Sequence, residues 1–147
     1  MHPQQLESVL HAEIPLTRAM QISVEKCSDK EVLLKAPLEP NINHKKTAFG
    51  GSLYSVAVLS GWSMVYVLLD RLGINAQIVI HQSEINYQAA VTGMIEARCE
   101  LSSDIDIEKF SKLMQRKGRA RLKLKSRVIS EGKNAVEFEG VYVCLAH

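Results

Sequence analysis

Hydrophobic and polar residues alternate along six stretches of the chain, and this period-two pattern predicts six β-strands. The predicted strands cover residues 19–25, 31–36, 77–90, 94–102, 119–130 and 134–146. Turn-forming residues separate the first two strands at Ser28 and Asp29, and the last two at residues 131–133. We therefore expect a hairpin near each end of the chain.

Two short segments repeat their apolar residues at helical spacing instead. In residues 3–12, Leu6, Val9 and Leu10 share one face and Pro3 stands in the first turn, which predicts an amphipathic helix that packs as a lid. Residues 106–116 predict a second short helix.

A third helical segment is apolar on nearly every side. Residues 47–69 carry no charged side chain and are long enough to span a bilayer. Four serines interrupt this segment, and the strands on both sides of it are half-buried with nothing else to cover them. An apolar helix outside lipid must be enclosed by protein. We predict no membrane association and an α+β fold, in which a curved antiparallel sheet wraps around one long apolar helix over about residues 50–72.

Composition narrows the class of protein without indicating a function. The 147 residues are 46% hydrophobic and 23% charged, as in an ordinary soluble domain, so we expect one domain over residues 1–147. The net charge of +2 is too small for a protein that wraps a polyanion. Cys27, Cys99 and Cys144 are odd in number and far apart, and the N-terminus has no secretory pattern. We expect a cytoplasmic protein without disulfide bonds.

The start of the long helix is the first candidate site. Gly50 and Gly51 open it, and the free N–H groups of a helix start can stabilise an oxyanion, an effect of about 10²- to 10³-fold in rate per donor. A polar loop with Asn43, His44 and Thr47 precedes them, and polar groups beside an apolar helix are typical of a small-molecule site. The alternative is that the two glycines only turn the chain into the helix.

A basic strand is the second candidate site. Basic residues alternate with Ala, Leu and Ser along residues 119–127, so one face of the strand is wholly basic. These residues are Arg119, Arg121, Lys123, Lys125 and Arg127. They could receive an acidic carrier protein or the phosphates of coenzyme A, or they could form a solvated outer face. No aromatic residues interleave with them, so nucleic acid is not expected. No motif indicates a metal or another cofactor.

Residues 43–55, N-H-K-K-T-A-F-G-G-S-L-Y-S, resemble the Asn/Gln-x5-His-Gly-Gly helix-start motif of the hotdog-fold acyl-thioester enzymes. Residues 83–90, S-E-I-N-Y-Q-A-A, resemble the strand that follows the helix in that fold. More closely, and over almost its whole length, the chain resembles a small bacterial thioesterase-like domain, found alone or fused behind an N-acetyltransferase-type domain. The resemblance implies a hotdog domain that assembles as a dimer or a dimer of dimers.

The resemblance also implies roles for individual residues. Gly50 and Gly51 would donate to the thioester carbonyl of an acyl-coenzyme A or acyl carrier protein, and the Asn43 side chain would contact the substrate. The substrate would also lie near His44, Thr47, Phe49 and Ser52. The chain departs from the family in two places, because Phe49 replaces the motif histidine and Val58 stands where the hydrolases often carry Asp or Glu.

The missing base leaves three functions open. Hydrolysis needs a base to activate water, whereas decarboxylation of a malonyl thioester, known among some relatives, chiefly needs its enolate stabilised. Non-catalytic binding or dimerisation is the third. A substitute base could be His81 or Glu84, which face opposite sides of a regular strand, so at most one of them would point into the site. Asp70 lies about 30 Å along the helix from Gly50, too far to act at the helix start of its own chain. Tyr54, Trp62 and Tyr66 share a helix stripe, which favours core packing over an acyl tunnel.

Overall fold

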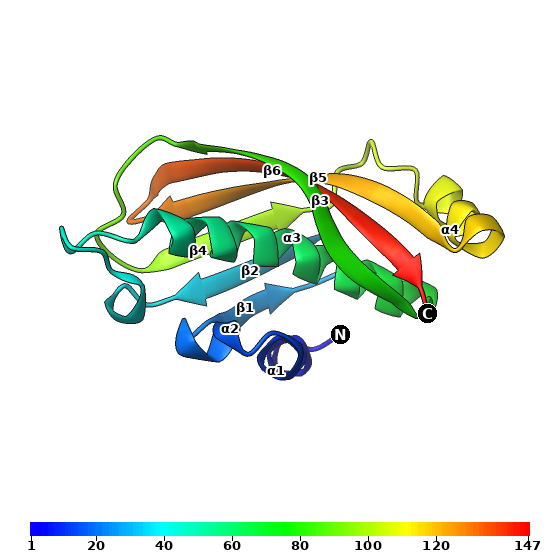
Figure 1. The fold of residues 1–147 in the computed structure, drawn as a ribbon, viewed down its shortest axis with the longest axis horizontal. Helices are drawn as coiled ribbons and strands as arrows, with labels where there is room; N and C mark the ends of the chain where they lie inside the picture. Colours follow the sequence, from blue (N-terminus) through cyan, green and yellow to red (C-terminus); the bar gives the residue numbers. More distant parts are fainter.

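Six antiparallel strands form one strongly curved sheet in the computed structural model, which describes residues 1–147 (Figure 1). The strands are β1 (Ser23–Cys27), β2 (Glu31–Ala36), β3 (Ala76–Tyr87), β4 (Ile95–Glu100), β5 (Arg119–Ser130) and β6 (Lys133–Ala146). Their order in the sheet is β1-β2-β4-β5-β6-β3, and all five neighbouring pairs are antiparallel. The two predicted hairpins are confirmed, and β3 and β1 are the free edges.

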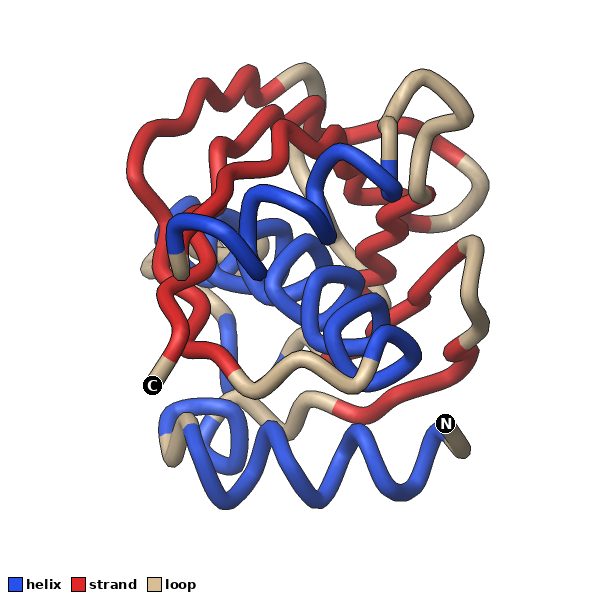
Figure 2. The backbone as a smooth tube through the Cα atoms, turned by 90° about the vertical axis from the view of Figure 1, so that its right-hand side faces the viewer, coloured by secondary structure: helices blue, strands red, loops and turns tan.

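The long helix α3 (Gly50–Leu72) runs through the middle of the molecule with the sheet curled around it (Figure 2). Its most apolar stretch has a mean hydropathy of 1.6, enough to cross a membrane by length and composition, but 67% of that stretch is buried inside the protein. Gly73 ends the helix in the left-handed region at φ 67, where glycine is favoured. The prediction of an enclosed apolar helix over residues 50–72 is confirmed.

Three further helices and one 3-10 turn complete the fold. Helix α1 (Pro3–Glu13) buries Leu6 and Leu10 completely and packs on β1, where Glu7 accepts a hydrogen bond of 2.8 Å from the Val24 N–H. The short α2 (Leu16–Ala19) follows it, and both lie on the β1 side of α3 (Figure 1). Helix α4 (Ile107–Lys117) joins β4 to β5 and buries Phe110 and Met114 in the same core, while η1 (Glu39–Asn41) is a single 3-10 turn.

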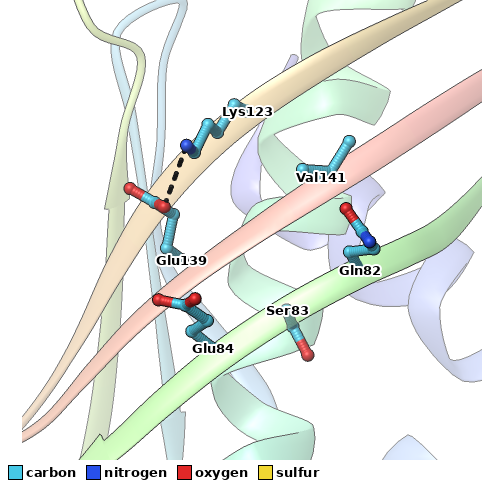
Figure 3. A pocket seen from close by; sticks show the side chains of 6 residues that line it. All are labelled: Gln82, Ser83, Glu84, Lys123, Glu139 and Val141. Carbon is cyan, nitrogen blue, oxygen red and sulfur yellow. Dashed lines mark ion pairs between the residues drawn. The ribbon is translucent and has the colours of Figure 1, made fainter.

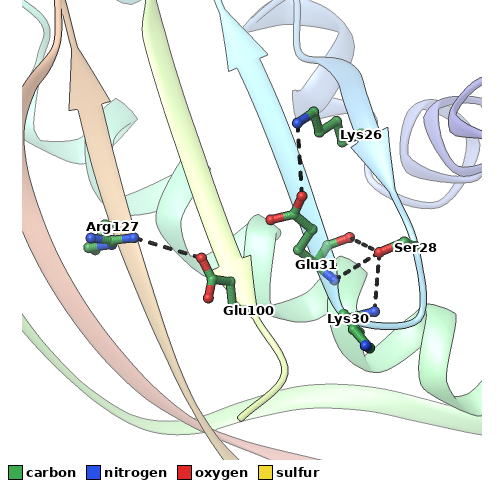
Figure 4. Close-up of polar contacts among 6 residues, drawn as sticks. All are labelled: Lys26, Ser28, Lys30, Glu31, Glu100 and Arg127. Atoms are coloured by element: carbon green, nitrogen blue, oxygen red, sulfur yellow. Dashed lines mark hydrogen bonds and ion pairs between the residues drawn. The ribbon is translucent and has the colours of Figure 1, made fainter.

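The β1–β2 hairpin turn forms at the predicted residues. The Ser28 hydroxyl accepts hydrogen bonds from the N–H groups of Lys30 and Glu31, at 3.2 and 3.1 Å (Figure 4). Cross-strand ion pairs join Lys26 to Glu31 at 4.0 Å and Arg127 to Glu100 at 3.8 Å on the outer face of the sheet. Exposed pairs of this kind contribute about 0–1 kcal/mol each, so they affect register and solubility more than stability.

The first predicted strand was placed too early. Residues 19–22 are not extended: α2 ends at Ala19, Gln21 has φ 57, and β1 begins only at Ser23. Met20 and Ile22 are nevertheless both buried, because a helix end followed by a turn also directs alternate residues to one side. The strand predicted over residues 77–90 is also too long, because β3 ends at Tyr87 and residues 88–90 lie beyond it.

Strand β3 contains a β-bulge that the sequence pattern does not reveal. Ile80 pairs with Tyr142 and Gln82 with Val141, so His81 is an extra residue opposite β6. The bulge breaks the strict alternation of faces across His81. The argument that His81 and Glu84 face opposite sides of a regular strand therefore does not apply.

Candidate active site

The loop before α3 is held by the side chain of Asn43. Its Oδ1 accepts hydrogen bonds from the N–H groups of Lys45 and Thr47, at 2.8 and 3.2 Å. Its Nδ2 donates to the Thr47 hydroxyl at 2.9 Å and to the Ala48 carbonyl at 3.4 Å. An asparagine side chain has two donor hydrogens and two acceptor lone pairs, so all four are used within the loop. The predicted contact between Asn43 and the substrate would require one of these bonds to break.

The start of α3 carries three backbone N–H groups without a partner. The first backbone N–H of the helix that forms a hydrogen bond is that of Leu53, which donates to the Phe49 carbonyl at 3.0 Å. No side chain caps the start of the helix. The N–H groups of Gly50, Gly51 and Ser52 are therefore free, as in any uncapped helix start. Together with the helix dipole they favour a negative charge at this end.

Two exposed aromatic rings flank these donors. Phe49 is 56% exposed and its ring covers Gly51 so closely that a Cβ there would overlap it. The Tyr87 hydroxyl, at the end of β3, donates to the Gly50 carbonyl at 2.9 Å. Burial and the neighbouring Tyr54 raise the pKa of Tyr87, so the hydroxyl stays protonated as a donor. Each predicted glycine thus lies beside one exposed aromatic side chain, Gly50 beside Tyr87 and Gly51 beside Phe49.

Asn41 is a buried residue of this region that the sequence analysis missed. It is 2% exposed, and its Nδ2 donates to the carbonyls of Met20 and Pro37, at 3.0 and 2.8 Å. Its own carbonyl accepts the Phe49 N–H at 2.7 Å, so Asn41 ties α2 to the residue that precedes α3. Nothing in the sequence distinguishes it from a turn asparagine beside Pro40.

A hollow of about 380 Å³ lies beside the helix start. Its lining is Leu16, Ala19, Met20, Pro40, Asn41, Phe49, Gly51, Ser52 and Ser55. None of these side chains titrates near neutral pH. Three predicted site residues, Phe49, Gly51 and Ser52, therefore share this hollow. The other predicted residues of the helix start lie outside its lining: Asn43, His44, Thr47 and Gly50.

The two substitute bases lie elsewhere on β3. At about 3.3 Å per residue, Glu84 is about 10 Å and His81 about 20 Å along the strand from Tyr87, which contacts Gly50. Figure 3 shows Glu84 beside Glu139, with the Ser83 side chain directed the other way, toward α3, where it hydrogen-bonds Tyr54. His81 is exposed. Within one chain neither residue is brought to the helix start.

The predicted basic strand face is present on β5, but it is partly neutralised. All five basic side chains are exposed. Lys123 pairs with Glu139 on β6 at 3.2 Å (Figure 3), and Lys125 pairs with the same carboxylate at 4.0 Å. Arg119 and Arg121 form no ion pair. Val128 on β5 and Tyr87 on β3 lie in the same row across the sheet, because both pair with Val136 on β6. Arg119 is nine residues from Val128 along β5, so it lies about 30 Å from the helix start along the sheet.

The three cysteines do not supply a nucleophile. Burial raises the pKa of both Cys99 and Cys144 to about 12, and it also raises the pKa of Cys27. Each thiol is therefore protonated at neutral pH, and only a thiolate attacks a thioester efficiently.

Comparison with known families identifies the chain. Residues 3–146 match the family model described as "Putative thioesterase (yiiD_Cterm)". The chain belongs to this thioesterase family. The match spans the helix start, the hollow and all six strands, so the site described above lies within the family domain.

Solved structures agree with this family assignment. A "putative thioesterase" from Shewanella oneidensis is 34% identical, with a TM-score of 0.88 over 97% of this chain and 96% of that one. A protein of unknown function from Chlorobaculum tepidum TLS is 33% identical, with a TM-score of 0.92 over 99% and 94%. A "probable thioesterase" from Pseudomonas aeruginosa, 18% identical, has a TM-score of 0.84 over 100% and 97% and shows the shared fold. The predicted hotdog fold is confirmed.

Proposed function

We propose that the protein acts on acyl thioesters of coenzyme A or of an acyl carrier protein, with the thioester carbonyl at the start of α3. The observation that supports this proposal is the set of three free N–H groups at Gly50, Gly51 and Ser52 beside an apolar hollow. When a thioester carbonyl becomes an oxyanion or an enolate, its oxygen gains negative charge, and these donors stabilise that charge. The hollow accepts the uncharged part of the substrate.

Asn43 acts in this proposal as a positioning residue. Its four hydrogen bonds hold the loop that ends at Phe49, and so they fix the first turn of α3. We expect Asn43→Ala to lower kcat by at least tenfold. We expect Asn43→Asp to lower it less, because the carboxylate still accepts the N–H groups of Lys45 and Thr47.

The measurement is kcat for the two variants on one acyl thioester, with thermal unfolding of each variant as the control for folding. A direct amide contact to substrate would give a different result. Since a carboxylate cannot donate to a carbonyl oxygen, Asn43→Asp would then be as inactive as Asn43→Ala.

Decarboxylation of a malonyl thioester is the second candidate, and the composition of the hollow favours it. Phe49 replaces the motif histidine, Val58 is a half-buried apolar residue, and no titratable side chain lines the hollow. In this reaction the bond between the carboxylate and the α-carbon breaks, and carbon dioxide leaves. The electron pair forms an enolate held by the helix start, and a proton from water completes the acetyl thioester. No base is needed to activate a nucleophile.

Mass spectrometry of loaded carriers tests the proposal. The purified protein is incubated with malonyl- and acyl-loaded carrier protein and with the matching coenzyme A thioesters. Free carrier thiol identifies hydrolysis, and loss of carbon dioxide alone identifies decarboxylation. If every thioester stays intact while the protein binds it, the domain is a binding module and the proposed catalysis is wrong.

We propose in addition that the protein is a dimer paired through β3. This edge strand bonds only to β6, and it exposes Val79, Ile80 and Tyr87 by 46%, 38% and 49%. A two-fold axis pairs identical strands antiparallel. The Tyr87 end of β3 in one protomer then lies beside the Ala76 end of β3 in its partner. The start of β5, which carries Arg119 and Arg121, lies at the Ala76 end of the sheet, so the helix start of one protomer lies at the same end of the assembly as these arginines in the partner subunit. A carrier or coenzyme A phosphate could use that end.

Val79→Lys is expected to convert the dimer to a monomer, because a charge would be buried at the paired edge. Sedimentation velocity at several protein concentrations measures the change. Lys123→Ala, a substitution on the outer face of the sheet, is the control and should leave the dimer intact. A monomeric parent protein would contradict the proposed pairing.

A further inference from the structure

The exposed side of α3 forms one continuous stripe along the helix. Gly51 is exposed, and Ser55, Val58, Trp62 and Tyr66 are half-buried. Their spacings of four, three, four and four residues place them on one helix face. From Leu53 to Leu69, every other α3 side chain except Tyr54 is buried. The prediction that Tyr54 shares a stripe with Trp62 and Tyr66 is wrong, because Tyr54 hydrogen-bonds Ser83 and packs edge-on against Phe138.

A second hollow, of about 620 Å³, lies at the far end of this stripe. Trp62 and Tyr66 stack there with ring centroids 5.4 Å apart. The rest of its lining is Glu13, Ile14, Asn75, Ala76, Gln77, Ile78, Val79 and His147. The Trp62 indole N–H donates to the Ile78 carbonyl at 3.3 Å, which fixes the ring against β3. The interpretation of Trp62 and Tyr66 as core side chains is therefore only half right, since both also face this hollow.

One short segment of chain, residues 13–20, contributes to the lining of both hollows. Glu13 and Ile14 line the far hollow, and Leu16, Ala19 and Met20 line the one at the helix start. Leu16 is 56% exposed although it is apolar. Residues 13–20 thus contribute to both hollows, and the α3 stripe runs from the free N–H groups beside the first hollow to the stacked rings in the second.

We propose that the two hollows join along the α3 stripe into one groove, from Gly51 to Tyr66, which binds the acyl chain of the substrate, and that Trp62 and Tyr66 limit the chain length. This inference rests on the proposed function, because it places the thioester at Gly51. Gly51 and Trp62 are eleven residues apart, or about 16 Å along the helix. An extended chain advances about 1.3 Å per carbon, given C–C bonds of about 1.5 Å, so a chain of about twelve carbons reaches Trp62.

The test uses Trp62 as a probe, because it is the only tryptophan in the chain. Saturated S-alkyl pantetheine thioethers of increasing length serve as ligands, since pantetheine is common to both carriers and a thioether cannot be hydrolysed. Calorimetry measures binding, and fluorescence reports contact with Trp62. We expect short chains to bind without a spectral change, and the change to begin at about twelve carbons.

Two variants and a matched control sharpen the test. Leu16→Ala removes an exposed apolar wall and should weaken the binding of long chains several-fold more than that of short chains. Met94 is likewise an exposed apolar residue, at 47%, but it lies outside the groove, so Met94→Ala should change the binding of neither long nor short chains. Val58→Phe adds bulk between the two hollows and should abolish the Trp62 response to long chains while short chains still bind.

The outcomes separate this inference from the proposed function. Long chains that bind or turn over without a response of Trp62 overturn the groove and leave the thioesterase activity standing. A length-dependent Trp62 response without turnover of any acyl thioester supports the groove and overturns the catalysis. A Trp62 spectrum that changes on protein dilution but not with chain length would mean that a second copy of the chain covers the groove, and it overturns the inference.

Discussion

Gly50→Pro is expected to lower kcat by about 10²- to 10³-fold, the usual effect of removing one oxyanion donor. Proline has no N–H, and Gly50 is the first residue of α3, the position where proline is best tolerated in a helix. The preceding residue, Phe49, already has φ −64 and ψ 134, the extended conformation that a following proline requires. The substitution therefore removes one donor from the site with little change to the fold.

Gly50→Ala is the matched variant for this experiment. It keeps the N–H, and its Cβ would lie 3.6 Å from the Tyr87 ring, an ordinary contact. The ratio of kcat between the alanine and proline variants therefore measures the donor alone, and circular dichroism confirms that both are folded. Equal rates for the two variants would exclude the Gly50 N–H from the reaction and leave those of Gly51 and Ser52 as the candidates.

Gly61→Ala is expected to destabilise the protein by about 1–3 kcal/mol, the cost of overpacking a core. Gly61 faces Tyr142, whose fully buried hydroxyl donates to the Val58 carbonyl at 2.8 Å. A Cβ on Gly61 would overlap the phenol ring and its oxygen. The helix would gain about 1 kcal/mol of propensity from alanine, but loss of the tyrosine hydrogen bond offsets a similar amount.

Ser63→Ala on the same helix is the control. The Ser63 hydroxyl is buried without a hydrogen-bond partner, so its removal should leave the free energy of unfolding unchanged or raise it. Urea denaturation followed by circular dichroism measures both variants. If Gly61→Ala unfolds at the same urea concentration as the parent protein, the close approach of α3 to β6 at Tyr142 is not required for stability.

The sequence predicts α3 well because its ends carry strong local signals. Paired glycines open the helix, Gly73 closes it, and charged residues return at Asp70. The error at residues 19–22 has the opposite cause. Met20 and Ile22 alternate with polar residues as in a strand, and only the tertiary position of α2 shows that a helix end and a turn bury them.

The site was predicted less completely than the fold, because its details depend on contacts. Asn41 and Asn43 look alike in the sequence, yet the first is buried beneath the hollow and the second is fully used in its own loop. Trp62 and Tyr66 repeat at helical spacing as core residues do. They face a hollow because the sheet ends at β3 and because residues 13–20 run nearby. The periodicity of α3 predicts neither of these features.

The bulge at His81 also bears on how the protein stays in solution. An exposed, flat edge strand is a template on which further chains can add without limit, and β3 is a long strand with apolar side chains on its free edge. A bulge bends and twists a strand locally, so a regular strand from an unrelated protein cannot follow β3 along its full length. Before the proposed pairing of two protomers covers this edge, we expect the bulge to disfavour the open-ended addition of further chains to β3.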